Sequence, residues 1–264
     1  MGTLDAPKVT ATSITQNGRF EPWELQVARS QISWHAEQNV FGYGTTAATA
    51  NLYRTVWENM ATAEYVFPSS AVTMQLVSTA AGDTATITIA GLDANYLPIS
   101  ELLILNGTTN VPTANQYLRI NTMFVSAGSA TNPSGVVTLT NSAVVYAQIN
   151  TGVFNGVTAS VGTTQMAVYT VPAGYTFYGH RYGAYSSFNG NSANYTTYRA
   201  ITNSSSGAQR MIVQTPFNTV YEVHRLYPLP YAEKTDLRWQ IAPSSATAAT
   251  VSINIGGVLV KNSV

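Results

Sequence analysis

The chain has 264 residues, enough to bury a large hydrophobic core and too many for a small scaffold that depends on cross-links. Twelve basic and twelve acidic side chains cancel to a formal net charge of +0, and charged residues make up only 9% of the sequence, against about 25% in a typical soluble domain. Nucleic-acid binding needs clustered basic residues to neutralise phosphates, so we expect no nucleic-acid partner. With so few charged side chains, electrostatic repulsion between copies of the protein is weak and opposes self-association little. We therefore predict a component that assembles.

The sequence contains no cysteine, which excludes disulfides, thiolate metal sites and thiol nucleophiles. Residues 1–18 are polar and rich in threonine, and they lack the basic and apolar regions of a secretory signal. The longest aliphatic run covers residues 102–105, far short of the roughly 20 apolar residues that span a bilayer. We therefore expect synthesis in a cytoplasm and no membrane partner.

Residues 1–65 differ in composition from the rest of the chain. They carry ten charged side chains, whereas residues 102–221 carry four, and they hold Trp23, Trp34 and Trp57. Alternation with a period of two is weak here, so the large apolar residues have no sheet of their own to cover. This pattern predicts an N-terminal arm that packs on another surface.

A short helix is predicted within the arm, over residues 47–61. Leu52, Val56 and Met60 recur there at helical spacing. The helix would lie either on its own domain or on a partner protein. Pro68 follows soon afterwards and would prevent the helix from continuing.

From residue 72 onward, short runs rich in valine, isoleucine, threonine and tyrosine are separated by turn residues, at the roughly 8–12-residue spacing of all-β sandwiches. The predicted strands cover residues 72–78, 84–91, 99–105, 116–126, 135–140, 143–149, 165–171, 175–187, 195–202, 209–226 and 236–258, and the last of these segments holds two strands. The dipeptides Asn106-Gly107, Asn155-Gly156 and Asn189-Gly190 are typical of tight hairpin turns.

No long helical pattern separates these strands, which favours antiparallel sheets over a parallel α/β sheet. We therefore predict an all-β fold: an antiparallel, jelly-roll-like β-sandwich body over residues 66–264, preceded by the arm of residues 1–65. The sequence leaves open whether the body is one sandwich or two. Residues 150–164, rich in glycine, serine and threonine, are the candidate internal boundary.

Catalytic and metal-binding patterns find little support. His35, His180 and His224 show no metal-ligand spacing, and no G-x-S-x-G motif is present. Asp83 and Asp93 both sit in turn contexts, where a short carboxylate bonds its own backbone. A calcium site at Asp93 would lack most EF-hand positions. We expect no enzyme activity, no metal and no cofactor.

Residues 42–47 match a dinucleotide-binding G-x-G-x-x-A pattern. That motif works only where a buried strand delivers the glycines to a helix N-terminus. The preceding residues 34–39 do not form such a strand pattern, so we interpret the match as coincidental.

Aromatic residues are concentrated between residues 175 and 198. Tyrosine is favoured where one end of a side chain is buried and the other wet, as in subunit interfaces and sugar-binding surfaces. Regular alternation would place Tyr178 and Tyr182 on one face of their strand. We predict that Tyr178, Tyr182, Tyr195 and Tyr198 form an oligomer contact or a glycan-binding surface, with a role in the core as the alternative.

Several segments resemble a virion structural protein of tailed phages, of a type common in marine and cyanobacterial phages. The similarity runs from about residue 65 to the C-terminus. The resemblance rests on the order and spacing of the matching segments. The matching segments are FPSSAVTM (67–74), residues 84–96 with GLDANY at 91–96, residues 99–101, LNGTTNV (105–111), residues 117–121, MAVYTVPAGY (166–175) and PLPYAEKTDL (228–237).

The resemblance implies a non-enzymatic protein located in the virion. Capsid decoration is the preferred role, with the major capsid protein or other virion proteins as partners. The alternative is a tail- or neck-associated fibre or receptor-binding protein that recognises a host surface glycan.

Assembly is expected to use the arm as well as the body. We predict that Trp23, Trp34, Phe41 and Trp57 anchor the arm on a neighbouring subunit or on the capsid, because interfaces concentrate binding energy in buried aromatic residues. The competing interpretation is that they complete the core of the β-domain. Sandwiches with few surface charges bury their sides well in closed rings, so we expect a homo-oligomer, with a trimer as its predicted form.

Overall fold

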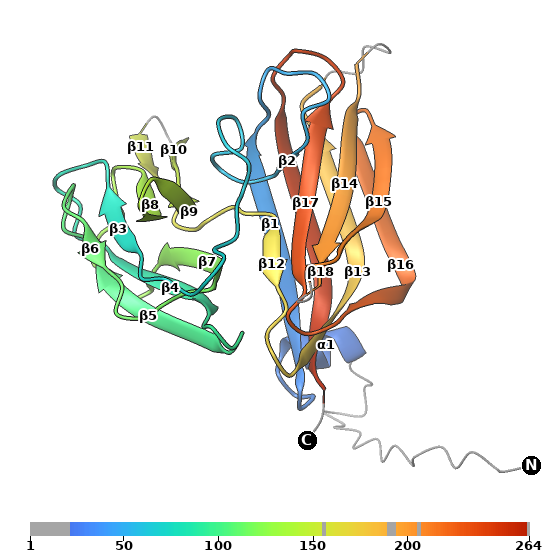
Figure 1. Cartoon of the computed structure of the whole chain (residues 1–264), viewed down its shortest axis with the longest axis horizontal. Helices are drawn as coiled ribbons and strands as arrows, with labels where there is room; N and C mark the ends of the chain where they lie inside the picture. The colour runs from blue at the N-terminus through green and yellow to red at the C-terminus, as the bar shows by residue number, and fades with distance from the viewer. Residues whose placement is uncertain (1–21, 155–156, 189–193, 205–206, 263–264) are drawn as a thin grey trace, which may run out of the picture.

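The computed structural model describes residues 22–154, 157–188, 194–204 and 207–262. The chain is built almost entirely from antiparallel β-sheets, with one short helix, α1 (Trp23–Ala28), before the first strand. This confirms the predicted all-β fold. Figure 1 shows two β-units beside one another. We call residues 35–71 and 165–262 the body, and residues 72–164 the insert.

Two sheets form the body. The first has the order β1-β18-β13-β16, and the second has the order β12-β17-β14-β15, with β2 also paired to β17. The strand bounds are β1 His35–Thr45, β2 Arg54–Thr55, β12 Val168–Thr170, β13 Tyr175–Ser186, β14 Thr196–Asn203, β15 Gln209–Phe217, β16 Val220–Tyr231, β17 Asp236–Pro243 and β18 Thr250–Lys261. The first half of β18 alternates between buried and less buried residues, with Ile253 in the core, as the period-two side-chain pattern of a strand requires. β17, which contains the core residue Trp239, is buried at every position except Arg238.

The insert contains a sheet of order β6-β3-β8-β9, a sheet of order β5-β4-β7 and the hairpin β10-β11. Their bounds are β3 Gln75–Ser78, β4 Thr86–Leu92, β5 Pro98–Ile104, β6 Val111–Pro112, β7 Arg119–Val125, β8 Val137–Asn141, β9 Val144–Ile149, β10 Thr151–Phe154 and β11 Val157–Ser160. The predicted turn at Asn106-Gly107 is present, with Gly107 at a φ of 54°. The predicted turns Asn155-Gly156 and Asn189-Gly190 lie outside the described residues.

Residues 35–65 belong to the body and do not form a separate arm, which corrects the boundary expected at residue 65. β1 pairs along its whole length with β18, from His35 opposite Val260 to Thr45 opposite Thr250. Trp57 is 1% exposed and packs within the same core. The strand that β1 needs as a partner lies at the other end of the chain, so local sequence patterns could not reveal the pairing.

Residues 47–61 are not helical, contrary to the predicted helix. They form turns around the two-residue strand β2, and their buried apolar residues reach the core from an irregular segment. Val56 donates its N–H to the Trp239 carbonyl and accepts a bond from the Ala167 N–H. These bonds to neighbouring strands occupy backbone groups that a helix would use internally.

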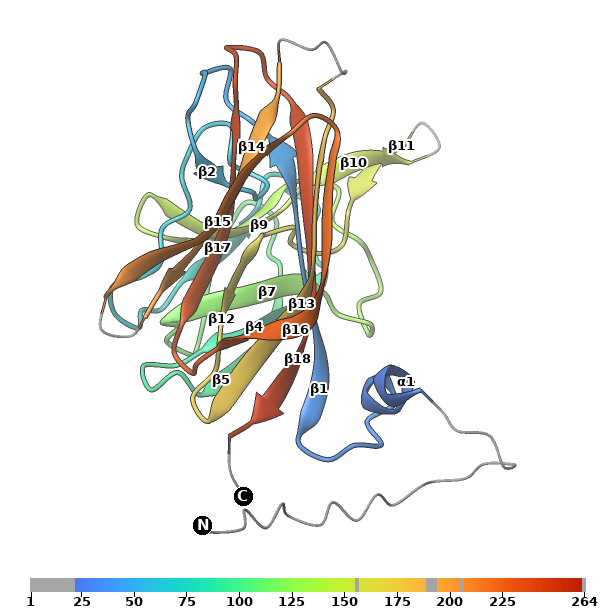
Figure 2. The same ribbon diagram turned by 90° about the vertical axis from the view of Figure 1, so that its right-hand side faces the viewer.

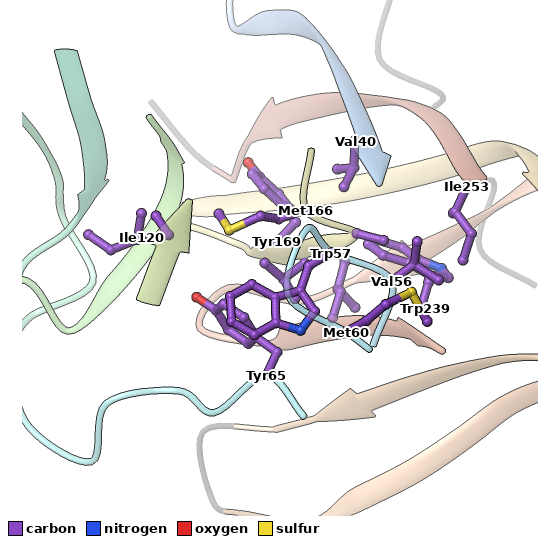
Figure 3. Close-up of a cluster of buried hydrophobic side chains, with 14 of the residues drawn as sticks. Val40, Val56, Trp57, Met60, Tyr65, Ile120, Met166, Tyr169, Trp239 and Ile253 are labelled. Carbon is purple, nitrogen blue, oxygen red and sulfur yellow. The ribbon is translucent and has the colours of Figure 1, made fainter. Parts of the chain in front are cut away.

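The core continues from the body into the insert. Figure 3 shows Val40, Trp57, Trp239 and their neighbours in one cluster, with Ile120 of β7 at its margin. Both units therefore share buried apolar contacts where the insert joins the body.

A buried ion pair links the insert to the body at this junction. Arg119 of β7 donates from Nε and Nη2 to the two carboxylate oxygens of Asp236 in β17, at 2.7 and 2.8 Å. The same guanidinium donates from Nη1 to the carbonyls of Pro68 and Leu118, and Thr170 donates its hydroxyl to Asp236. This network fixes the insert against one side of the body.

Within the described residues, no helix is long and apolar enough to cross a membrane.

Candidate assembly surface

Three residues predicted as contact residues lie in the core. Trp57 is 1% exposed and packs edge-on against Tyr65, while Tyr182 and Tyr198 are 5% and 0% exposed. None of these three side chains presents a surface to a partner, so their assignment to an assembly or glycan surface is corrected. For Trp57, the core interpretation considered above holds.

A β-bulge explains why Tyr182 does not share a face with Tyr178. Between Gly179 and Arg181 the pairing of β13 with β18 shifts, because two steps along β13 oppose one step along β18. Such a bulge reverses the facing of every residue beyond it. Tyr178 therefore stays 38% exposed, while Tyr182 turns inward and bonds Tyr231 through their hydroxyls.

The other predicted contact residues are accessible but lie on separate elements. Trp23 in α1 packs edge-on against His35, and Trp34 lies under the Lys261 ammonium at 4.6 Å. Phe41 is on β1, and Tyr195 precedes β14, where its N–H bonds Ser244. Exposed fractions are 47% for Trp23, 50% for Trp34, 43% for Phe41 and 42% for Tyr195. These four side chains are therefore accessible to a partner.

A cleft of about 580 Å³ lies between the insert and the β1 side of the body. Phe41 lines it together with amide and hydroxyl side chains, among them Gln38, Ser100 and Thr122, and none of the described lining residues is charged. Neutral polar groups beside an aromatic ring are the usual chemistry of a sugar-binding site. Asn121, also in the lining, is held by bonds in both directions to the backbone of Thr170.

The opposite side of the body has no covering element among the described residues. β16 ends the first sheet and β15 ends the second, and the two strands follow one another in the chain. Figure 1 shows them along the margin of the body that faces away from the insert. We call this margin the β15–β16 side. Sequence analysis missed it, although Pro216, Pro228 and Pro230 are signals of edge strands.

Large apolar side chains are exposed on the β15–β16 side. Leu226 and Tyr227 are 85% and 80% exposed, higher than any other large apolar residue among those described, and Met211 and Val220 are more than half exposed. The cause is a backbone irregularity in β16. In the pairing of β16 with β13, Leu229 lies opposite Gly179, and the next paired residue of β16, His224, lies opposite Arg181. Residues 225–228 therefore have only His180 opposite them, and they protrude.

A recess adjoins this protrusion. It has a volume of about 450 Å³ and is lined by residues of β14, β15, β16 and the following turn, including Arg210, Ile212, Leu229 and Thr235. Figure 2 turns the molecule so that the side of Figure 1 on which β15 and β16 lie faces the viewer. The β15–β16 side thus combines an apolar protrusion with a partly apolar hollow.

Tyrosines close the core beneath this side. Tyr182, Tyr198, Tyr221 and Tyr231 border a cavity of about 20 Å³, just inside β15 and β16. Burial raises the pKa of each of these phenols, so all four remain neutral at physiological pH. The interior behind the two edge strands therefore carries hydroxyl groups but no phenolate charge.

The two carboxylates considered as catalytic candidates have structural roles, but Asp83 bonds the distant residues 134 and 135, whereas Asp93 alone bonds within its own turn. Asp83 accepts bonds from the Ser78 hydroxyl and from the N–H groups of Ser134 and Gly135. Asp93 accepts the N–H groups of Asn95 and Leu97, the turn geometry expected from the sequence. Among the described residues, no group of three or more histidine, aspartate or glutamate side chains is placed to hold a metal ion.

Buried Glu58 has an unusual environment. Its Oε1 accepts the N–H of Gln165, while its Oε2 is buried without a protein partner. Loss of solvation raises the pKa of Glu58 to about 8, although the bond from Gln165 acts in the opposite direction. The side chain lies where the chain returns from the insert to the body.

Comparisons with known proteins give no family assignment. No protein family and no curated protein matches the chain. Among solved structures, the Yersinia pseudotuberculosis-derived mitogen is 15% identical with a TM-score of 0.23, over 34% of this chain and 82% of its own. The T=1 particle protein of infectious bursal disease virus is 9% identical with a TM-score of 0.25, over 87% and 70%. The PBSX exported protein XepA is 12% identical with a TM-score of 0.21, over 84% and 86%. Likenesses at these TM-scores carry no argument about function.

Proposed function

We propose that the protein is a non-enzymatic structural component of a tailed-phage particle, located in the virion and built to assemble through its β-body. The observation that carries this proposal is the apolar β15–β16 side, where Leu226 and Tyr227 are 85% and 80% exposed in a chain with only 9% charged residues. Exposed apolar clusters on a soluble domain mark interaction sites. The sequence resemblance to tailed-phage virion proteins supplies the phage context.

Capsid decoration is the preferred location, with the major capsid protein as partner and a homo-oligomer as the assembling unit. Quantitative mass spectrometry of purified particles tests this location. A copy number comparable with that of the major capsid protein supports decoration, and a copy number of a few per cent of it points to the tail or neck. Absence of the protein from washed particles would refute a structural role altogether.

A second candidate is a tail- or neck-associated protein that recognises a host surface glycan. The neutral cleft lined by Phe41 and Gln38 favours it, because aromatic and amide groups suit sugar rings and hydroxyls. Calorimetric titration with host surface polysaccharide tests it, with Phe41→Ala expected to abolish binding. Phe124→Ala is the matched control, since Phe124 is also partly exposed, at 37%, and is not among the cleft residues.

A further inference from the structure

We propose that the β15–β16 side binds a second copy of the same chain across a two-fold axis, with Leu226 and Tyr227 of each copy seated in the recess of the other. This inference rests on the proposed role in assembly and names the surface and the partner that assembly uses. It commits to a contact between identical copies in solution.

The position of this side in the topology is the first step. The insert and residues 46–66 cover the β1–β12 side of the body, where Arg119, Asn121 and Glu64 make bonds to the body's strands. On the β15–β16 side, no strand of the described chain pairs with the outer edge of either strand. Prolines and charged side chains in both strands oppose the addition of a further strand, but no described element covers the apolar side chains exposed there.

Self-complementarity identifies the occupant as a second copy. A two-fold contact uses the same patch on both partners, so that patch must hold both a protruding group and a place to receive it. Leu226 and Tyr227 protrude from β16, and the recess begins at Leu229, three residues further along the same strand. A partner of another kind would require only the protrusion or only the recess, so the presence of both within one strand favours a second copy.

The chemistry of the two features matches. Ile212 and Leu229 give the recess an apolar floor for Leu226, and Arg210 offers a cation for the ring or hydroxyl of Tyr227. The volume of about 450 Å³ lies within the roughly 300–1,000 Å³ of pockets that enclose drug-sized groups. Tyrosine and arginine are among the residue types that carry most of the binding energy at interfaces.

Contact through side chains fits this edge better than addition of a strand. Pro216 in β15 and Pro228 and Pro230 in β16 have no N–H to donate to a neighbouring strand. The protruding residues 225–228 also interrupt the straight edge that continuous pairing needs. Two copies therefore meet by interlocking protrusions and recesses, and their sheets do not merge.

The size of the side is sufficient for a stable contact. β16 has 12 residues and so extends about 40 Å, and two sheets about 10 Å apart with their outer side chains make the side about 20 Å thick. This gives about 800 Å² per copy, the area that each partner buries in a standard protein–protein interface.

Light scattering of the intact chain after gel filtration tests the contact. At tens of micromolar we expect a particle of twice the 28.3 kDa chain mass. We expect the double variant Leu226→Ser/Tyr227→Ser to elute as a monomer whose circular dichroism spectrum matches that of the intact chain, which shows that it is folded. The matched control is Leu102→Ser/Ile104→Ser in β5, where the two residues are 65% and 64% exposed on the insert. This control should remain dimeric.

A cross-linking experiment places the contact independently of its strength. Because the chain contains no cysteine, Tyr227→Cys and Thr235→Cys proteins can be mixed and oxidised, and disulfide-linked pairs containing one of each are expected. Tyr227→Cys mixed with Leu102→Cys should give no such pair.

A monomeric intact chain, or an oligomer that both serine variants leave unchanged, overturns the proposal. Dissociation by both variants indicates a head-to-tail ring and overturns the two-fold geometry, in favour of the trimer predicted from composition. These outcomes are distinct from failure of the proposed function, which is decided by whether the protein is present in particles.

Discussion

Replacing Asp236 with asparagine tests whether the buried ion pair holds the insert on the body. The Asp236 carboxylate receives two bonds from Arg119 and one from the Thr170 hydroxyl. The side chains of the pair are 9% and 11% exposed, so solvent screens their attraction little. The Arg119 guanidinium also lies over the rings of Phe67 and Tyr96, at 4.8 and 5.5 Å.

The substitution leaves a buried guanidinium without its counter-charge. The new amide can still accept one bond, but its NH₂ group faces an N–H donor of Arg119. Removing one partner of a buried, hydrogen-bonded ion pair costs about 3–5 kcal/mol. The double variant Arg119→Met/Asp236→Leu should recover part of this loss, because no unpaired charge remains. Its recovery is incomplete, since the Pro68 and Leu118 carbonyls lose their donor.

Thermal unfolding followed by circular dichroism measures the effect. A loss of 3–5 kcal/mol corresponds to a fall in melting temperature of about 6–20 °C for a domain of this size. Glu222→Gln is the control, because Glu222 is exposed and accepts one long bond from Tyr185, and it should change stability by less than about 0.5 kcal/mol. If Asp236→Asn lies within about 1 kcal/mol of the unaltered protein, the pair does not hold the junction.

Three further predictions concern the core. Because burial raises the pKa of Glu58 from 4.5 to about 8, the folded protein retains a proton that the unfolded chain releases. The contribution of Glu58 to stability is therefore greatest below pH 4.5 and falls as the pH rises to 8, by up to about 1.4 kcal/mol per pH unit. Thermal melts should show a shallower fall in stability between pH 5 and pH 8 for Glu58→Gln than for the unaltered protein, and equal slopes would contradict the assignment. Gly44→Ala places a Cβ atom 2.4 Å from the Trp57 carbonyl oxygen and should cost about 1–3 kcal/mol in urea unfolding, whereas Gly128→Ala, which meets nothing within 4 Å, should be neutral. Trp57→Ala should cost about 3–5 kcal/mol and Trp34→Ala less than about 1 kcal/mol; similar losses in urea unfolding would mean that Trp34 is also part of the core.

A strand could be predicted from the sequence where its own residues alternate between apolar and polar along its length. Residues 84–91 were expected as a strand and overlap β4, because Ile87 and Ile89 face the core while the intervening threonines do not. β1 was missed because its inward positions include Gly42 and Gly44, which carry no hydrophobic signal. A Cβ atom at Gly42 would lie 2.5 Å from that of Ala167. The glycines that resembled a dinucleotide motif therefore allow close packing against β1.

Residue facing could not be predicted where a bulge intervenes. The irregularity at Gly179 and Arg181 turns Tyr182 into the core, and the one in β16 pushes Leu226 and Tyr227 out. Both irregularities lie at His180 of β13, the first in its pairing with β18 and the second in its pairing with β16. A bulge depends on how many residues each partner strand supplies, and this number is set by the pairing of distant segments. Regular alternation therefore placed Tyr182 on the exposed face with Tyr178, whereas the bulge buries it in the core.

The topology explains why the β15–β16 side is left uncovered by the described chain. The chain leaves the body after β2 and returns through β12, and both strands pair with the same strand, β17. Both connections to the insert must therefore cross the β1–β12 side, which they cover. β15 and β16 are joined directly by residues 218–219, and no described strand pairs with the outer edge of either. The proposed contact between two copies on this side would therefore leave the insert and its cleft accessible to a different partner.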